Sequence, residues 1–205
     1  MVPTLCFSHI PKIDIFISKY KNIIVQFNAS FIDLKMTSEK KILVLNSRQI
    51  QQKIDRIAYQ ILEDNLDETE IVLAGLLSRG YRLAARLKAI LDEIAPFKVT
   101  LISIDLDKYS SNLNGSLSIP VEYCSNKAVV LVDDVLNSGK AMAYAFAIFI
   151  DIPLKKIRTV VLVDRNHKSF PIATDFTGLA LSTVLKEHVD VVLNENGEED
   201  AVYLR

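Results

Sequence analysis

The chain lacks tryptophan altogether, and its 205 residues include only two cysteines, three histidines, six glycines and six prolines. So little glycine and proline excludes a collagen-like or low-complexity chain. The two cysteines, Cys6 and Cys124, lie far apart and show no metal-binding spacing, which favours free thiols in a reducing compartment over a disulfide-stapled secreted domain. We therefore expect a cytoplasmic protein.

The chain also lacks an excess of charge of either sign, because 24 basic residues face 25 acidic ones and the net charge is −1. Proteins that grip a phosphate backbone usually present a basic face, so RNA binding is disfavoured, although a local basic patch stays open. No apolar run approaches the roughly 20 residues that a membrane span needs, because charges such as Lys12, Asp14 and Lys19 interrupt the apolar stretches near the amino terminus. No membrane partner is expected.

Half of the residues are hydrophobic, which is enough to build a substantial core. A length of 205 residues fits one domain of common size with an appendage. The composition changes near a second methionine, Met36. We therefore expect residues 36–205 to form the domain and residues 1–35 to be a weakly ordered amino-terminal extension.

Strand and helix patterns alternate along this domain. Apolar runs predict strands over Ile71–Ala74, Val99–Leu106, Ala128–Val132 and Arg158–Val163. Apolar residues at helical spacing predict helices over Ile50–Leu62, capped by Asn46 or Ser47, over Tyr81–Ile94 and over Ala141–Ile150. The alternation predicts an α/β fold with a mostly parallel twisted sheet flanked by helices.

The carboxyl-terminal end follows a different pattern. Two short apolar stretches, Val189–Leu193 and Ala201–Leu204, are separated by a turn that includes Gly197. This pattern predicts a hairpin, placed at an edge of the sheet or as a hood over it.

The segment VVLVDDVLNSGKA, residues 129–141, carries the clearest chemical signal. An apolar strand runs into Asp133 and Asp134, and a turn at Ser138 and Gly139 leads into a helix, so the turn lies at the carboxyl end of a strand, where open α/β sheets bind ligands. Backbone N–H groups of such a turn and of the helix start form an anion site. Two carboxylates would repel a bare phosphate, so we assign them to sugar hydroxyls or to a developing positive charge. Together they indicate a phosphorylated sugar as ligand.

At these residues the sequence resembles the signature with which phosphoribosyltransferases bind phosphoribosyl pyrophosphate (PRPP). Among the type I enzymes it is most similar to the family of bifunctional pyrimidine operon attenuators and uracil phosphoribosyltransferases. The similarity covers roughly Ile42 to Leu204 and includes GLLSRG at 75–80, IDLDKY at 104–109 and VLVDRNHKSFPI at 161–172. It implies the type I phosphoribosyltransferase fold.

The resemblance also implies roles for individual residues. Asp133, Asp134 and Arg79 would be catalytic, with the two aspartates on the ribose hydroxyls and near the cationic transition state. Ser78 and Arg79 would bind pyrophosphate, Arg165 would lie near the base, and the backbone of Val189 would meet uracil. The turn over the 5′-phosphate would consist of Val135, Leu136, Asn137, Ser138, Gly139, Lys140 and Ala141.

The implied reaction transfers ribose 5-phosphate from PRPP to a nucleobase. Uracil is the favoured base, and the products are then UMP and pyrophosphate. Mg²⁺ would be the cofactor, held mainly by substrate and water rather than by a protein metal site. Relatives of this kind assemble as dimers or larger, so a homo-oligomer is expected. Two alternatives stay open: a catalytically weak sensor of PRPP or nucleotide that regulates pyrimidine genes, and a purine phosphoribosyltransferase.

Departures from the family pattern bear on activity. Ala141 stands where the family has a threonine that donates to the 5′-phosphate, and Ser110 stands where it has an arginine in a mobile loop. The loop segment between Ser110 and Val121 contains no lysine or arginine. Losing one hydrogen bond to a charged group costs about 1.5 to 3 kcal/mol, so we expect weaker PRPP binding and slower turnover than in relatives that keep these residues.

Overall fold

The computed structural model describes residues 41–106, 115–182, 187–194 and 199–205. In this part of the chain the strands form a six-stranded sheet of order β4-β3-β2-β5-β6-β7 and a separate three-stranded sheet of order β1-β9-β8. The strands of the large sheet are β2 (Glu70–Leu76), β3 (Lys98–Leu106), β4 (Gly115–Leu117), β5 (Ala128–Leu136), β6 (Lys156–Asp164) and β7 (Phe176–Ala180). The small sheet contains β1 (Ile42–Asn46), β8 (Val189–Val192) and β9 (Ala201–Leu204). The helices are α2 (Ser47–Asp64), α3 (Arg79–Ile94), α4 (Lys140–Ala147) and the 3₁₀ turn η1 (Val121–Cys124).

The large sheet confirms the prediction of a mostly parallel sheet. Strands β3, β2, β5, β6 and β7 pair in parallel, and the short β4 pairs antiparallel with β3. Strand β2 lies in the middle, with β3 on one side and β5 on the other, so the chain reverses its direction of travel across the sheet between β2 and β5. Ligands of open α/β sheets bind outside the carboxyl ends of the strands at such a switch point.

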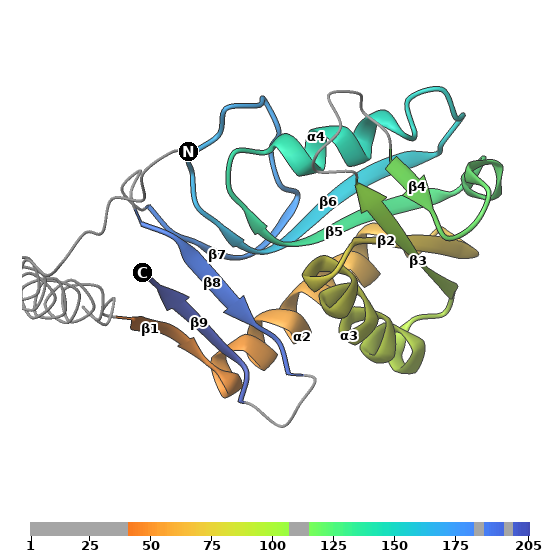
Figure 1. Cartoon of the computed structure of the whole chain (residues 1–205). Coiled ribbons are helices and arrows are strands. Elements are labelled where there is room, and N and C mark those ends of the chain that lie inside the picture. Colours follow the sequence, from red (N-terminus) through yellow and green to blue (C-terminus); the bar gives the residue numbers. More distant parts are fainter. Residues whose placement is uncertain (1–40, 107–114, 183–186, 195–198) are drawn as a thin grey trace, which may run out of the picture. The chain divides into compact units, whose positions relative to one another are not determined.

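Helices cover both faces of the large sheet, with α2 and α3 on one face and α4 on the other (Figure 1). Side chains alternate along each strand, because successive residues point to opposite faces. On β5, Val130 and Val132 pack in the core under α2 and α3, while Val129 and Leu131 pack in the core with α4. Both faces are therefore buried, as the uniformly apolar strands predict.

The helices begin and end close to the predicted positions. Asn46 caps α2 through its side chain, which accepts from the backbone N–H of Gln49, and the Gln49 side chain bonds back to the N–H of Asn46. This reciprocal capping box satisfies two N–H groups that the first turn leaves free. Helix α3 begins two residues before the predicted Tyr81, and α4 ends at Ala147 rather than at Ile150.

The carboxyl-terminal pair β8 and β9 is antiparallel, as the predicted hairpin requires, but it is not an edge of the large sheet. Strand β1, from the start of the described domain, pairs with β9 and completes a separate small sheet, which we call the hood. One side of the hood packs into the core of α2 and α3 through Leu45, Val191 and Val202. The sequence pattern predicted neither β1 nor the short strands β4 and β7.

Strand β5 is longer than predicted and ends at Leu136 instead of Val132, so Asp133 and Asp134 lie within the strand rather than directly after it. The predicted extension, residues 1–35, lies outside the described residues, as do residues 107–114 of the predicted mobile loop. Among the described residues, no helix is both long and apolar enough to cross a membrane.

Candidate functional site

Two loops that carry predicted site residues meet at the switch point between β2 and β5. The register of the two strands places Gly75 opposite Val132, so the segments that follow, Leu76–Arg79 and Asp133–Asp134, run side by side. The peptide bond between Leu77 and Ser78 is cis. The motif GLLSRG therefore lies beside the acidic pair, although over fifty residues separate them in sequence.

Both glycines of GLLSRG are required by close approach of the backbone. A Cβ on Gly80 would lie 2.5 Å from the carbonyl oxygen of Val132 and 2.8 Å from the Cα of Asp133. A Cβ on Gly75 would lie 2.5 Å from the Cα of Tyr81. Glycine thus lets the first turn of α3 pack directly on β5. This packing sets the position of Arg79, the first residue of α3, relative to the aspartates.

A cavity of about 370 Å³ opens at this point. Its walls come from β2, β3, β5 and the starts of α3 and α4, and its lining includes Ser78, Arg79, Asp133, Asp134 and Ala141. The cavity therefore brings together both predicted catalytic aspartates, both predicted pyrophosphate ligands and the last residue of the predicted phosphate turn. Its floor is apolar, with Leu76, Ile104 and Leu106.

Strand β5 and Arg79 both help to hold the acidic pair. The backbone N–H of Asp134 donates to Oδ1 of Asp133 at 2.9 Å. The Asp134 carboxylate is 13% exposed, and its Oδ2 lies 3.7 Å from Nη1 of Arg79, an ion pair too long for a direct hydrogen bond. Arg79 itself is 49% exposed at its side chain. Asp134 thus lies in the cavity with the Arg79 guanidinium beside it but too far away for a hydrogen bond. This arrangement leaves the carboxylate oxygens of Asp134 open to hydroxyl donors.

The turn after β5, which the sequence predicts as the phosphate turn, leads through a left-handed glycine into α4. Gly139 adopts φ +80°, a left-handed conformation that favours glycine, and lies directly before the first residue of α4. The hydroxyl of Ser138 accepts from the N–H of Lys140 at 3.3 Å. The carbonyl of Ser138 accepts from Ser169 and Phe170, which fixes the turn against the loop after β6. Of the predicted turn residues, Val135 and Leu136 belong to strand β5, whereas Asn137 to Gly139 form the turn itself.

Arg165 is placed differently from the residues of the cavity. It is only 4% exposed, and its guanidinium donates to Oδ1 of Asn137 at 2.9 Å and to the carbonyl of Glu187. It therefore ties the phosphate turn to the segment that enters the hood. Val189 begins β8 and is half-buried, paired with Leu204. Neither Arg165 nor Val189 lines the 370 Å³ cavity.

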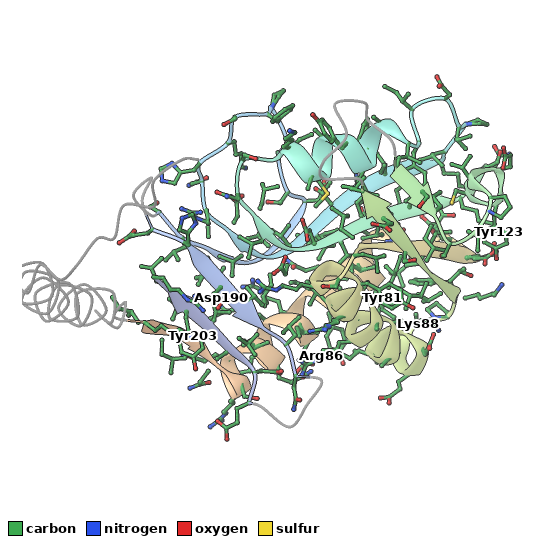
Figure 2. All side chains as sticks on the ribbon, viewed as in Figure 1. Tyr81, Arg86, Lys88, Tyr123, Asp190 and Tyr203 are labelled. Atoms are coloured by element: carbon green, nitrogen blue, oxygen red, sulfur yellow. The ribbon has the colours of Figure 1, made fainter. Side chains whose placement is uncertain are left out.

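One charged residue at the site was missed by sequence reasoning. Asp190, labelled in Figure 2, lies on the hood strand β8. Its Oδ1 lies 3.1 Å from Nη2 of Arg79. Its other carboxylate oxygen lies 2.5 Å from Nη2 of Arg205. The only sequence signal is an aspartate within the otherwise apolar strand VDVV.

Comparison with known proteins agrees with this geometry. The family profile described as the phosphoribosyl transferase domain matches residues 44–196, which include the whole site described above. The chain therefore belongs to the phosphoribosyltransferase family, whose members bind PRPP and a nucleobase and generally use Mg²⁺ with PRPP. It is an enzyme of the phosphoribosyltransferase class.

Within that family the chain is PyrR-like. The bifunctional protein PyrR of Clostridium novyi is 35% identical over 175 residues, which cover 80% of this chain and 97% of that protein. The bifunctional protein PyrR of Macrococcus caseolyticus is 31% identical over 172 residues, covering 80% of this chain and 99% of that protein. The resemblance inferred from the motifs is thereby confirmed.

Solved structures confirm the fold. The hypoxanthine phosphoribosyltransferase of Trypanosoma cruzi matches with a TM-score of 0.65 at 18% identity, covering 80% of this chain and 95% of that chain. A hypoxanthine-guanine phosphoribosyltransferase of Bacillus anthracis matches with a TM-score of 0.58 at 22% identity, covering 68% of this chain and 81% of that chain. At such low identity these likenesses show the type I phosphoribosyltransferase fold and do not identify the base.

Proposed function

We propose that the chain transfers ribose 5-phosphate from PRPP to uracil and yields UMP and pyrophosphate. The observation that carries this proposal is the single cavity shared by Ser78, Arg79, Asp133 and Asp134, with the left-handed turn at Gly139 at the start of α4. Uracil is favoured over a purine because the relatives at 31–35% identity are PyrR proteins, whereas the purine enzymes resemble this chain only in fold.

The proposed mechanism is substitution at C1 of the ribose. Pyrophosphate leaves as positive charge builds on the sugar ring, and a ring nitrogen of the base forms the new bond on the opposite side. Asp133 and Asp134 hold the ribose hydroxyls and stabilise the developing charge, and Arg79 draws the departing pyrophosphate away from the sugar. The turn at Ser138 and Gly139 fixes the 5′-phosphate, so catalysis consists of positioning and electrostatics without a covalent nucleophile.

The residues present fit Mg²⁺ as the proposed cofactor. Mg²⁺ keeps several waters and borrows substrate phosphate oxygens, so it would be held mainly by substrate and water, and the carboxylates of Asp133 and Asp134 in the cavity stay available to the ribose hydroxyls. The described residues contain no cluster of three or more potential metal ligands. When bound, the ion would neutralise charge on the pyrophosphate.

The direct test is the release of pyrophosphate from PRPP and Mg²⁺ with a panel of bases. We expect release with uracil and none with hypoxanthine, guanine or adenine. Release with a purine alone would contradict uracil as the base but would still support the cavity as the PRPP site. Absence of PRPP binding, measured by calorimetry, would contradict the proposal as a whole.

A second candidate function is that of a sensor which binds PRPP or UMP and turns over slowly. Ala141 favours it, because this residue lines the cavity with a methyl group where the family pattern has a hydroxyl donor. The same assay separates the two functions, since a sensor binds UMP or PRPP tightly in calorimetry and releases no pyrophosphate with any base.

RNA is not the partner that the described surface favours. Arg56, a basic residue of α2, donates to the carbonyl oxygens of Thr177 and Gly178 at 2.6 and 2.8 Å. Its guanidinium is therefore used to hold α2 against β7. Residual RNA binding would show as an affinity that falls steeply with salt.

We further propose a cytoplasmic homo-oligomer. The buried free thiol of Cys124 suits a reducing compartment. Phe146 and Ile150, near the end of α4, are 37% and 68% exposed and offer apolar surface for a second copy. Light scattering on the purified chain gives the mass in solution, and a monomer at micromolar concentration would contradict the assembly.

The domain boundary is also a proposal. We propose that residues 36–205 suffice for activity, since the profile match and all the site residues lie within them. A chain that starts at Met36 should then have the same kcat and KM as the full chain. A clear loss of activity or solubility in the short form would assign a role to residues 1–35.

A further inference from the structure

The hood and helix α3 are joined by two arginine–aspartate pairs. Arg79 and Arg86, two turns apart on α3, each meet an aspartate of the hood region: Asp190 on β8 and Asp200 just before β9. Arg86 and Asp190 are labelled in Figure 2. Arg86 places Nη1 2.5 Å from Asp200, whose carboxylate is 4% exposed. The Arg86 pair is thus a buried structural tie, whereas the Arg79 pair opens on the cavity.

The Arg79 side chain needs an external anchor to hold a defined position. It is long and half-exposed at the cavity, and such a side chain has many rotamers when nothing fixes it. Its contact with Asp134 is loose at 3.7 Å, so that pair alone does not fix the guanidinium. The contact with Asp190 is shorter, at 3.1 Å, and falls within hydrogen-bond distance.

Asp190 is itself held in place. Its Oδ2 receives from Arg205 at 2.5 Å, and its side chain is 20% exposed. The backbone of Arg205 exchanges two hydrogen bonds with that of His188, at 2.8 and 2.9 Å, so Arg205 is fixed to the residue directly before β8, the strand that carries Asp190. The Asp190 carboxylate therefore spans two guanidinium groups, with one oxygen for each.

We propose that Asp190 is a positioning residue that aims Arg79 at the pyrophosphate. One nitrogen of the fork, Nη2, is held by Asp190 from the hood, and the other, Nη1, faces Asp134 in the cavity. A planar guanidinium fixed at one edge presents its remaining donors in a set direction, and this orientation suits bidentate recognition of phosphate oxygens. Asp190 acts through Arg79 and does not itself touch substrate.

The inference rests on the proposed role of Arg79 as a pyrophosphate ligand, and the experiment separates the two. Binding of magnesium pyrophosphate is measured by calorimetry for the parent chain and for Asp190→Ala, Asp190→Glu, Arg79→Ala and the double variant. Asp92→Ala is the matched control, because it removes an exposed ion pair with Lys88 on the same helix. Thermal melting of each variant checks that it is folded.

We expect Asp190→Ala to weaken pyrophosphate binding about tenfold and to raise the KM for PRPP by a similar factor, with kcat changed less than threefold. Asp190→Glu should restore binding to within about threefold of the parent, and Asp92→Ala should have no effect. Since Asp190 acts through Arg79, the double variant should bind no more weakly than Arg79→Ala. Arg205→Ala should weaken binding about threefold, because it frees the Asp190 carboxylate.

Three results would overturn the inference in distinguishable ways. If Arg79→Ala weakens binding while Asp190→Ala binds as tightly as the parent or more tightly, Asp190 does not position Arg79, and the proposed function stands. If Arg79→Ala binds pyrophosphate as well as the parent, the assigned role of Arg79 fails and the inference about Asp190 falls with it. A double variant clearly weaker than Arg79→Ala would show that Asp190 acts by another route.

Discussion

The two ends of the parallel strands both carry acidic side chains, but they hold them very differently. At the amino-terminal end, Glu70 of β2 accepts from the hydroxyls of Thr100 and Tyr123, both at 2.7 Å, and pairs with Lys98 and Lys127 at 3.0 and 3.1 Å. At the carboxyl-terminal end, the cation beside Asp134 is Arg79, at 3.7 Å. Close partners tie the fold together around Glu70, whereas the longer ion pair of Asp134 leaves its charge available to a ligand.

The same contrast extends along the amino-terminal end. Asp64, at the end of α2, meets Lys156 and Arg158 of β6 at 2.9 and 3.1 Å, and Glu68 meets Lys155 at 2.8 Å. Burial raises the pKa of Asp64, but the bonds from Arg158 and Lys156 outweigh it and leave the pKa below its usual value. These pairs fasten α2 and the loop after it to the start of β6. Charge at this end is therefore structural.

The largest effect is expected from Asp134→Asn at the ligand end. The amide keeps the size of the side chain but removes the charge that would face the cationic transition state, so kcat should fall a hundredfold or more. The melting temperature should change little, because the ion pair that Asp134 makes within the described part of the chain is long, at 3.7 Å. Steady-state kinetics and thermal melting provide both values. A variant with the parent's kcat would remove Asp134 from the catalytic machinery.

A gain of function is expected from Ala141→Thr. Ala141 lines the cavity at the start of α4, where a threonine hydroxyl could donate to the 5′-phosphate. One added hydrogen bond to a charged group contributes roughly 1.5 kcal/mol, so PRPP should bind about tenfold more tightly. Ala141→Val is the control, since it adds the same bulk without a donor. Equal affinities of the two variants would show that the phosphate does not lie at this position.

The features that the sequence could predict are those with a local pattern. The apolar strands and the run from Asp133 to Gly139 are local signals. They located the parallel strands β2, β3, β5 and β6, the alternation of strands and helices along the chain, and one wall of the cavity. GLLSRG was a weak motif by itself, and the reason for its glycines appears only in the structure, where Gly80 packs against Asp133. Local patterns thus identified the segments but not their contacts.

Residues whose role depends on distant segments could not be predicted in the same way. Arg165 follows a strand, like many solvated loop residues, but is buried because Asn137 and Glu187 both converge on its guanidinium. Asp190 interrupts an apolar strand, and its partner Arg79 lies far earlier in the sequence, at the start of α3. Strand β1 belongs to the hood only because β9 returns to pair with it. In each case tertiary packing decided the outcome.

The smallest effect on activity, with a clear effect on stability, is expected from Glu70→Gln at the structural end. Burial raises the pKa of Glu70, but the hydrogen bonds from Thr100, Tyr123, Lys98 and Lys127 outweigh it and lower the pKa to about 2. Because the folded-state pKa lies below the usual value of 4.5, the stability from this group is complete above about pH 4.5 and is lost as the pH falls towards 2.

Glu70→Gln should therefore lower the free energy of unfolding at pH 7 by about 1 to 2 kcal/mol, since it replaces charged hydrogen bonds by neutral ones. Denaturant unfolding at several pH values between 7 and 2.5 should show a shallower acid loss in the variant than in the parent chain, because the variant has no carboxyl group to protonate at this position. The values of kcat and KM at pH 7 should stay within twofold of the parent, as Glu70 lies at the end of β2 opposite to Leu76 and the cavity. A large loss of activity would mean that the two ends of the sheet are coupled. If the free energy of unfolding falls equally with pH in the variant and in the parent chain, protonation of Glu70 does not cause the loss of stability in acid.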